Sequence, residues 1–170
     1  MIKDDIEARD FFLHTLEWLA AVMDRYPGYL YFGLVLVSYA SADELGKHFG
    51  AKEAVRQLGE VGDSLKDILR KTDLIARDGT DFWILTPYTP ANETIRDKVL
   101  STVQALPHQE LGIVERDVSI FALPIDLGPA SLRQKPEDLL RYLKANRQAM
   151  ASHFFRLSLD QSTQPPASVV

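Results

Sequence analysis

The chain has 170 residues, 46% of them hydrophobic and 25% charged, and its 19 Lys and Arg against 24 Asp and Glu give a formal net charge of −5. This is the composition of a single globular domain, which excludes disordered, collagen-like and coiled-coil chains and, without any cysteine, disulfide frameworks and thiolate sites. The acidic balance also argues against a nucleic-acid partner, because affinity for phosphate backbones needs clustered Lys and Arg.

The N-terminal segment gives no sign of export or membrane insertion. Residues 1–7 carry acids where a signal peptide has a basic start and an apolar core. The longest apolar run, Tyr29 to Val37, is far shorter than the ~18–20 residues of a membrane-spanning helix. We therefore expect a cytoplasmic protein.

The first half of the chain predicts a helix, a strand and two further helices. Apolar residues recur at helical spacing between Asp10 and Tyr26, which indicates an amphipathic helix. Tyr29 to Val37 is aromatic and β-branched without polar alternation, which is typical of a strand buried on both faces at the centre of a sheet. Residues 40–71 lack proline and have a helical apolar pattern interrupted by glycines, so two helices are expected there.

The second half predicts a hairpin followed by alternating helices and strands. Leu74 to Arg77 and Phe82 to Thr86 flank Asp78-Gly-Thr-Asp81, whose residues are typical of a hairpin turn. Together the elements predict an α/β sandwich with a mixed sheet, and the polar, proline-rich residues 160–170 predict a disordered tail. The remaining expected elements are a helix, a strand, a helix beginning at Pro136 and an edge strand: 91–106, 118–123, 136–153 and 154–159.

The stretch from Gly62 to Pro87 resembles the centre of the GGDEF family, the diguanylate cyclase domains. These domains have Gly-Asp, a helix, Arg-x-x-Asp, a strand, the Gly-Gly-Asp/Glu-Glu-Phe hairpin and a strand ending in proline. The same order is present here, with Arg70-Lys-Thr-Asp73 before the hairpin Gly79-Thr-Asp-Phe82. The resemblance covers residues 4–159 and implies one GGDEF-like domain of a bacterial signalling protein. Its implied fold is the nucleotide cyclase or palm-like arrangement, a mixed central β-sheet flanked by helices.

Three parts of the family's catalytic site differ in this chain. Neutral residues stand at Ser38 to Ala40, where the metal-binding carboxylates would fall, although Mg²⁺ needs oxygen ligands and prefers carboxylates. The hairpin Gly79 to Phe82 is one residue short, with a single glycine and a single acid. Val55 and Arg56 stand where the family commonly has Asn and Asp. The resemblance therefore implies a degenerate cyclase without catalytic residues, bound metal or cofactor.

One functional motif of the family is retained. Arg70 and Asp73 stand at the position of the Arg-x-x-Asp inhibitory site for cyclic di-GMP, the I-site. A guanidinium can donate to guanine O6 and N7, and a carboxylate can accept from N1–H and N2–H, so both edges of the base can be recognised. Further basic residues complete the expected ligand site: Lys66, Lys71 and Arg96, with Lys98 as the alternative to Arg96.

The same residues also have a plainer interpretation. Arg70 and Lys71 would favour the dipole at the end of a solvent-exposed helix, and Asp73 would cap the turn into the next strand. Asp81 fits a turn residue better than a metal ligand. The two tryptophans, Trp18 and Trp83, lie in apolar stretches and are expected in the core. The four histidines are scattered without the spacing of metal ligands.

The sequence thus favours a catalytically inactive receptor that binds cyclic di-GMP through Arg70 and Asp73 and passes its occupancy to a partner protein. The alternative is a structural module that binds no nucleotide and mediates dimerisation or docks onto another protein. An active nucleotide cyclase is the third and least favoured hypothesis.

Overall fold

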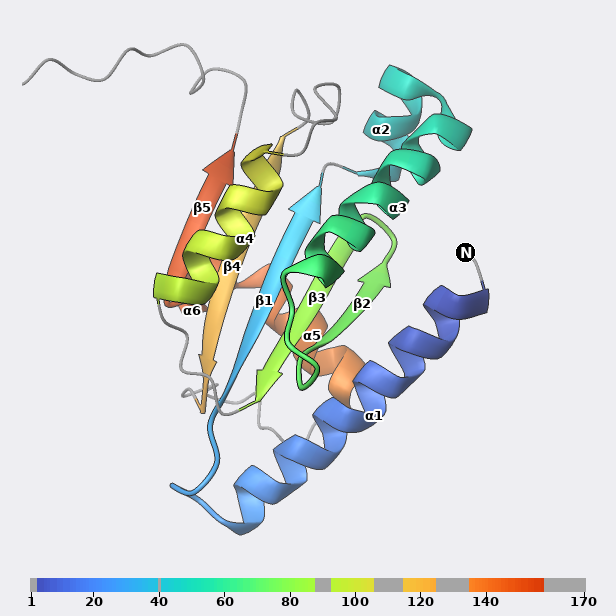
Figure 1. Ribbon diagram of the computed structural model, residues 1–170. Helices are drawn as coiled ribbons and strands as arrows, with labels where there is room; N and C mark the ends of the chain where they lie inside the picture. The colour runs from blue at the N-terminus through green and yellow to red at the C-terminus, as the bar shows by residue number, and fades with distance from the viewer. Residues whose placement is uncertain (1–2, 40, 88–92, 106–114, 125–134, 158–170) are drawn as a thin grey trace, which may run out of the picture.

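A computed structural model describes residues 3–39, 41–87, 93–105, 115–124 and 135–157 (Figure 1). The expected domain end at residue 159 and the tail 160–170 lie outside these residues. The elements follow one another as α1 Lys3–Arg25, β1 Phe32–Tyr39, α2 Ala42–Phe49, α3 Ala51–Asp67, β2 Leu74–Asp78, β3 Asp81–Pro87, α4 Glu93–Ala105, β4 Arg116–Leu123, α5 Pro136–Ala145, α6 Arg147–Met150 and β5 His153–Leu157.

The described strands form one five-stranded sheet in the order β2-β3-β1-β4-β5, so the predicted central strand is confirmed. Each neighbouring pair is antiparallel, and the expected mixed sheet is therefore corrected to an antiparallel one. The reason is the hairpin. The crossover through α2 and α3 returns β2 in the same direction as β1, but β3 turns back and pairs between them.

Helices cover both faces of the sheet, which gives the domain two apolar cores (Figure 1). On β1, Phe32, Leu34 and Leu36 pack toward α1 and α5, whereas Val35 and Val37 pack toward α3 and α4. Every residue of β1 is buried. This accounts for the run without polar alternation, because a strand covered on both faces has no polar side.

Several predicted boundaries shift. β1 begins at Phe32 rather than Tyr29, and the Tyr29 side chain is 82% exposed. The helix expected over residues 136–153 breaks at Asn146 into α5 and α6. There the Asn146 side-chain amide donates to the Tyr142 carbonyl at 2.9 Å, and such local bonds compete with regular helix. None of the described helices combines the length and apolarity needed to cross a bilayer.

The two tryptophans have different environments. Trp83 is 3% exposed beneath α1 and α5, as predicted, and stacks on Phe121 with 6.2 Å between the ring centroids. Trp18 is 60% exposed, so the prediction that it lies in the core was wrong. Its place in the helix explains this, since it falls outside the spacing of the buried residues Phe12 and Leu16.

Burial of β1 can be tested with one substitution. Val35→Asp places a carboxylate in a fully buried position at a cost of several kcal/mol, enough to unfold a domain of roughly 5–15 kcal/mol stability. We expect loss of the cooperative thermal transition in circular dichroism. Val55→Asp makes the same change at an exposed position of α3 and should melt nearly as the parent does. A Val35→Asp protein with an unchanged midpoint would show that β1 is not buried.

Candidate functional site

The end of β1 and the tip of the β2–β3 hairpin are joined by polar contacts. Gly79 has a φ of 63°, which a glycine adopts at little cost in a tight turn. The Tyr39 amide donates to the Thr80 carbonyl at 3.2 Å, and the Thr80 hydroxyl donates to the Tyr39 carbonyl at 3.4 Å. The Ser38 hydroxyl donates to Asp81 Oδ1 at 2.7 Å. These bonds place the single acid of the expected hairpin motif directly against the end of β1.

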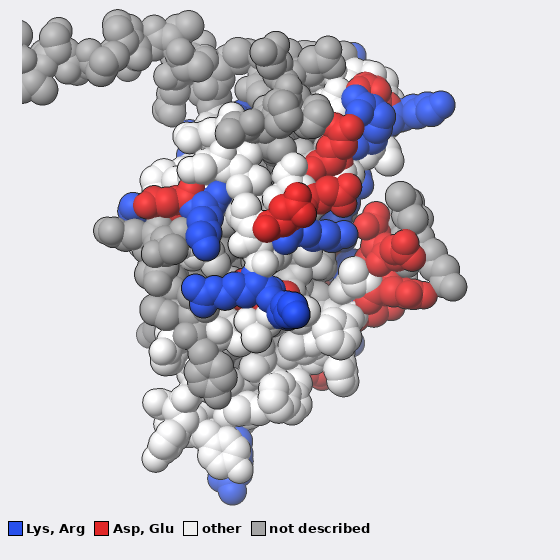
Figure 2. Space-filling model, viewed as in Figure 1, with Lys and Arg blue, Asp and Glu red and all other residues white. Residues whose placement is uncertain are grey.

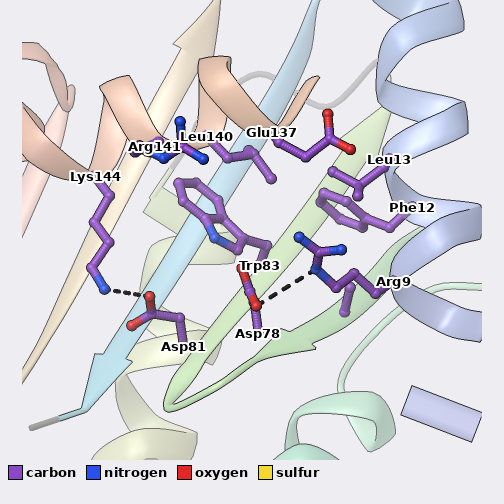
Figure 3. Close-up of a pocket in the computed structure, with 11 residues that line it drawn as sticks. Arg9, Phe12, Leu13, Asp78, Asp81, Trp83, Glu137, Leu140, Arg141 and Lys144 are labelled. Carbon is purple, nitrogen blue, oxygen red and sulfur yellow. Dashed lines mark hydrogen bonds and ion pairs between the residues drawn. The ribbon is translucent and has the colours of Figure 1, made fainter. Parts of the chain in front are cut away.

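Both carboxylate oxygens of Asp81 are engaged. Asp81 is 7% exposed, and its Oδ2 accepts from Lys144 Nζ of α5 at 2.5 Å (Figure 3). A divalent cation at this carboxylate would be repelled by the positive charge of Lys144. The neighbouring residues Ser38 and Tyr39 offer neutral hydroxyls where Mg²⁺ prefers carboxylates. The residues at this position therefore do not fit the metal site that the family resemblance implies.

Tyr39 is buried beside Arg116 at the same end of the sheet. Burial raises the pKa of the Tyr39 phenol far above its ordinary value, although the Arg116 charge partly opposes the shift. Burial likewise lowers the pKa of Arg116. Tyr39 consequently remains neutral at physiological pH and brings no negative charge to the position where the family's metal-binding carboxylates would fall. Within the described ranges, no group of three or more His, Cys, Asp and Glu side chains could hold a metal ion.

A cavity of about 180 Å³ lies beside this network, between α1, the hairpin and α5 (Figure 3). Trp83 and Leu140 provide apolar walls, and ion pairs lie at its edge. Arg9 Nε of α1 is 3.5 Å from Asp78 Oδ1 of the hairpin, in addition to the Lys144–Asp81 pair. Neither Arg9 nor Lys144 stands out as a functional residue in the sequence. A local pattern does not indicate the contact between Lys144 and Asp81, since the two are 63 residues apart in the chain.

A second cavity, of about 420 Å³, lies among α1, α3 and the hairpin. Val55, Arg56 and Lys66 of α3 line it together with Phe82. Arg56 is held by ion pairs to Glu53 and Glu60 of the same helix. Figure 2 shows that acidic side chains gather over α3 and the first turns of α1, with basic side chains among and below them. Lys66, which lines this cavity, lies four residues before Arg70 in the chain.

Arg70 and Asp73 lie in the turn that connects α3 to β2. Asp73 Oδ2 accepts from the Arg70 amide at 2.9 Å, and the Asp73 amide donates to the Arg70 carbonyl at 3.0 Å. The capping role in the plainer interpretation is therefore present. Asp73 Oδ1 is buried and has no hydrogen-bond partner among the described residues. The Arg70 residue is exposed, and no described carboxylate forms an ion pair with its guanidinium.

Of the other expected ligand residues, only Lys71 lies in this turn. Lys71 is exposed within it. Arg96 lies in α4, where its Nε is 2.9 Å from Asp97 Oδ1, and within the described segments no hydrogen bond or ion pair joins it to Arg70 or Asp73. The structure thus brings Arg70, Lys71 and Asp73 into one turn and places Lys66 on α3 and Arg96 on α4.

The Lys144–Asp81 ion pair can be tested through stability. Lys144→Met would leave a buried carboxylate with Ser38 as its described donor. We expect a loss of about 1–3 kcal/mol in the free energy of unfolding, between the values for exposed and buried pairs. Urea denaturation at neutral pH measures this change. Asp81→Asn combined with Lys144→Met should regain much of the loss, because the uncompensated charge is then absent.

Arg141→Met provides the matched control on the same helix. Arg141 pairs with Asp138, but its side chain is 76% exposed, so its loss should change stability by less than about 0.5 kcal/mol. Equal stability of Lys144→Met and the parent would contradict a stabilising role for the Asp81 contact.

Several solved structures of GGDEF domains have a similar fold. The diguanylate cyclase SiaD from Pseudomonas aeruginosa, solved in complex with its activator SiaC, is 19% identical with a TM-score of 0.61, over 84% of this chain and 55% of that one. The GGDEF domain of YfiN, also from Pseudomonas aeruginosa, is 20% identical with a TM-score of 0.59, over 85% and 92% of the two chains. The GGDEF domain of DgcB from Caulobacter crescentus, solved in complex with c-di-GMP, is 11% identical with a TM-score of 0.59, over 84% and 86%.

The present chain thus spans about half of the SiaD chain and most of the two isolated GGDEF domains. No family model matches the sequence, and no curated protein matches it. At these identities the likeness concerns the fold, and on that ground the chain has the α/β fold of GGDEF domains.

Proposed function

We propose that this chain is a catalytically inactive GGDEF-type domain that binds cyclic di-GMP at the turn between α3 and β2. The observation that carries the proposal is the Arg70 guanidinium, which is exposed on a turn whose backbone is held by Asp73. An exposed guanidinium without a described carboxylate partner can donate two parallel hydrogen bonds to guanine O6 and N7. The DgcB domain solved with c-di-GMP supports this choice of ligand.

The structure favours unequal roles for the two motif residues. Asp73 uses Oδ2 to hold the Arg70 amide, and its Oδ1 is buried. Asp73 therefore acts chiefly by positioning the turn, and its Oδ1 can accept from guanine N1–H or N2–H only after a local movement. Arg70 makes the larger contact with the guanine base. Lys71 in the same turn adds positive charge near the ligand's phosphates, and Lys66 on α3 and Arg96 on α4 add positive charge outside the turn.

The inactive state is supported by the end of β1. Transfer of a nucleotidyl group depends on metal ions that neutralise phosphates and on precise positioning. Here the hairpin carboxylate Asp81 is already paired with Lys144 and Ser38, and Tyr39 is kept neutral by burial. A protein cation and a hydroxyl stand where the reaction would need divalent metal.

Absence of turnover is directly measurable. Purified protein incubated with GTP and Mg²⁺ should form no cyclic di-GMP above a protein-free control, because the positioning and charge stabilisation of the reaction are missing. Liquid chromatography of the nucleotides gives the readout, and an active diguanylate cyclase treated in parallel validates the assay. Product above the control would refute the inactive state.

Ligand binding is tested by calorimetric titration with cyclic di-GMP and, separately, with GTP. We expect saturable binding of cyclic di-GMP, and a loss of roughly 1–3 kcal/mol on Arg70→Ala, the value of one bidentate guanine contact. That loss corresponds to about tenfold weaker affinity or more. Arg141→Ala removes another exposed arginine, on α5, and should leave the affinity unchanged.

Two results would contradict the receptor function. Absence of heat and of any thermal shift at high micromolar cyclic di-GMP would leave the non-nucleotide-binding structural module as the better hypothesis. Binding that survives Arg70→Ala would place the ligand elsewhere. Asp73→Asn separates its two roles, since a changed melting temperature with unchanged affinity would assign Asp73 to the turn alone.

A further inference from the structure

α1 has an apolar face that the domain does not cover. Phe11 and Trp18 are each 60% exposed in the middle of this helix. Among the large hydrophobic residues exposed in the described segments, all but Val55 lie on α1 or in the connection that follows it: Ile6, Phe11, Trp18, Tyr26, Tyr29 and Tyr31. Exposed aromatic residues concentrated on one element are typical of an interaction surface.

Helical geometry places Phe11 and Trp18 together. They are seven residues apart, which is close to two turns, so both lie on nearly the same line along the helix. The buried residues Phe12, Leu16 and Met23 occupy a different side and pack against the sheet. α1 therefore carries large apolar side chains on two sides, and only those on the inner side pack in the core.

An acidic row runs beside these aromatic residues. Asp10, Glu17 and Asp24 are also seven residues apart, and Asp10 and Glu17 each directly precede one of the exposed aromatics. All three are exposed. We call Phe11 and Trp18 together with this acidic row the outer face of α1. Over its whole length α1 carries six acidic and three basic residues, so the surroundings of this face are negative.

The acidic row borders a groove of about 360 Å³ between α1 and the start of α5. Asp10, His14 and Glu17 line one side, and Lys135 and Glu137 line the other. The groove therefore has more acidic than basic side chains. It offers a place where a basic side chain could lie next to an apolar residue that contacts Trp18.

We propose that the outer face of α1 docks an amphipathic helix of a partner protein, with apolar residues over Phe11 and Trp18 and with Lys or Arg facing the acidic row. Apolar contact and electrostatic complementarity commonly combine in this way when a helix binds a helical surface. The inference stands on α1 and is independent of cyclic di-GMP binding.

A second copy of the chain fits this face less well. Asp4 lies seven residues and Glu7 four residues before Phe11, so both share its side of the helix. Two parallel copies would place these acids opposite their own equivalents. Two antiparallel copies would set one acidic row against the other, which is destabilising. A basic helix meets neither difficulty.

The test uses a synthetic 18-residue helical peptide built from Leu and Lys, and the same peptide with Glu in place of every Lys. Trp18 and Trp83 are the two tryptophans of the chain, and Trp83 is buried, so Trp18 dominates fluorescence that responds to solvent. We expect saturable binding of the Lys peptide, a blue shift and protection of Trp18 from acrylamide. The Glu peptide should not bind. Trp18→Phe should abolish the fluorescence change and thereby assign it.

Charge and apolar variants then locate the contact. Glu17→Lys and Phe11→Ser, both at exposed positions, should each weaken the Lys peptide on the order of tenfold. Asp67→Lys reverses an exposed acid on α3 and serves as the matched control with unchanged affinity. Thermal melting of each variant checks that it is folded.

Three outcomes would overturn the proposal. These are equal binding of the Lys and Glu peptides, equal weakening by Asp67→Lys and Glu17→Lys, and binding without protection of Trp18. Sedimentation of the protein without peptide measures whether the chain dimerises. If concentrated protein dimerises and protects Trp18 without peptide, the occupant is a second copy rather than a basic helix.

Discussion

Complete burial of β1 is the constraint on which the rest of the structure depends. A strand with no exposed residue needs a strand on each edge and an apolar layer on each face. β3 and β4 pair with the two edges of β1. α1 and α5 cover one face of the strand, and α3 and α4 cover the other. Because β3 pairs with β1 through Ser38 opposite Asp81, the same register that buries the strand also carries the hairpin acid to its end.

That register buries the negative charge of Asp81, and the ammonium group of Lys144 compensates for it. A carboxylate buried at the start of β3 is costly unless it is paired and hydrogen-bonded. In an active metal-dependent site the cation would be a metal ion shared among several acids. Here Ser38 and Tyr39 are neutral, and the ammonium of α5 supplies the charge. The neutral end of β1 and the contact from α5 thus belong to one arrangement around the Asp81 carboxylate.

The sequence could predict those parts of the fold that depend on local pattern. The apolar run of β1, the hairpin around Gly79 and the helix beginning at Pro136 follow from spacing and turn residues. The relative direction of neighbouring strands could not be predicted, because the hairpin inserts β3 between β1 and β2, which the crossover would otherwise place side by side. The Lys144–Asp81 contact could not be predicted either, because the spacing of residues along the chain does not indicate which distant residues lie close together in the fold. Trp18 shows the limit of apolarity as a criterion, because hydrophobic residues at a surface meant for a partner look like core residues in the sequence.

β2 adjoins both the turn and the helix that carry the two proposed surfaces. This strand follows the Arg70–Asp73 turn directly and packs along α1, and Arg9 of α1 reaches Asp78 at its other end. Occupancy of the turn and docking on α1 would therefore both act on elements that adjoin this five-residue strand. Coupling between two sites is reciprocal and requires that each ligand prefer the same state of the element between them. Arg9 and Asp78 are both partly exposed, so their ion pair is weak and can be exchanged at small cost, whereas the Ser38–Asp81–Lys144 network holds the neighbouring strand. The adjustable part of the hairpin is accordingly its outer strand, which follows the Arg70–Asp73 turn and packs against the inner side of α1.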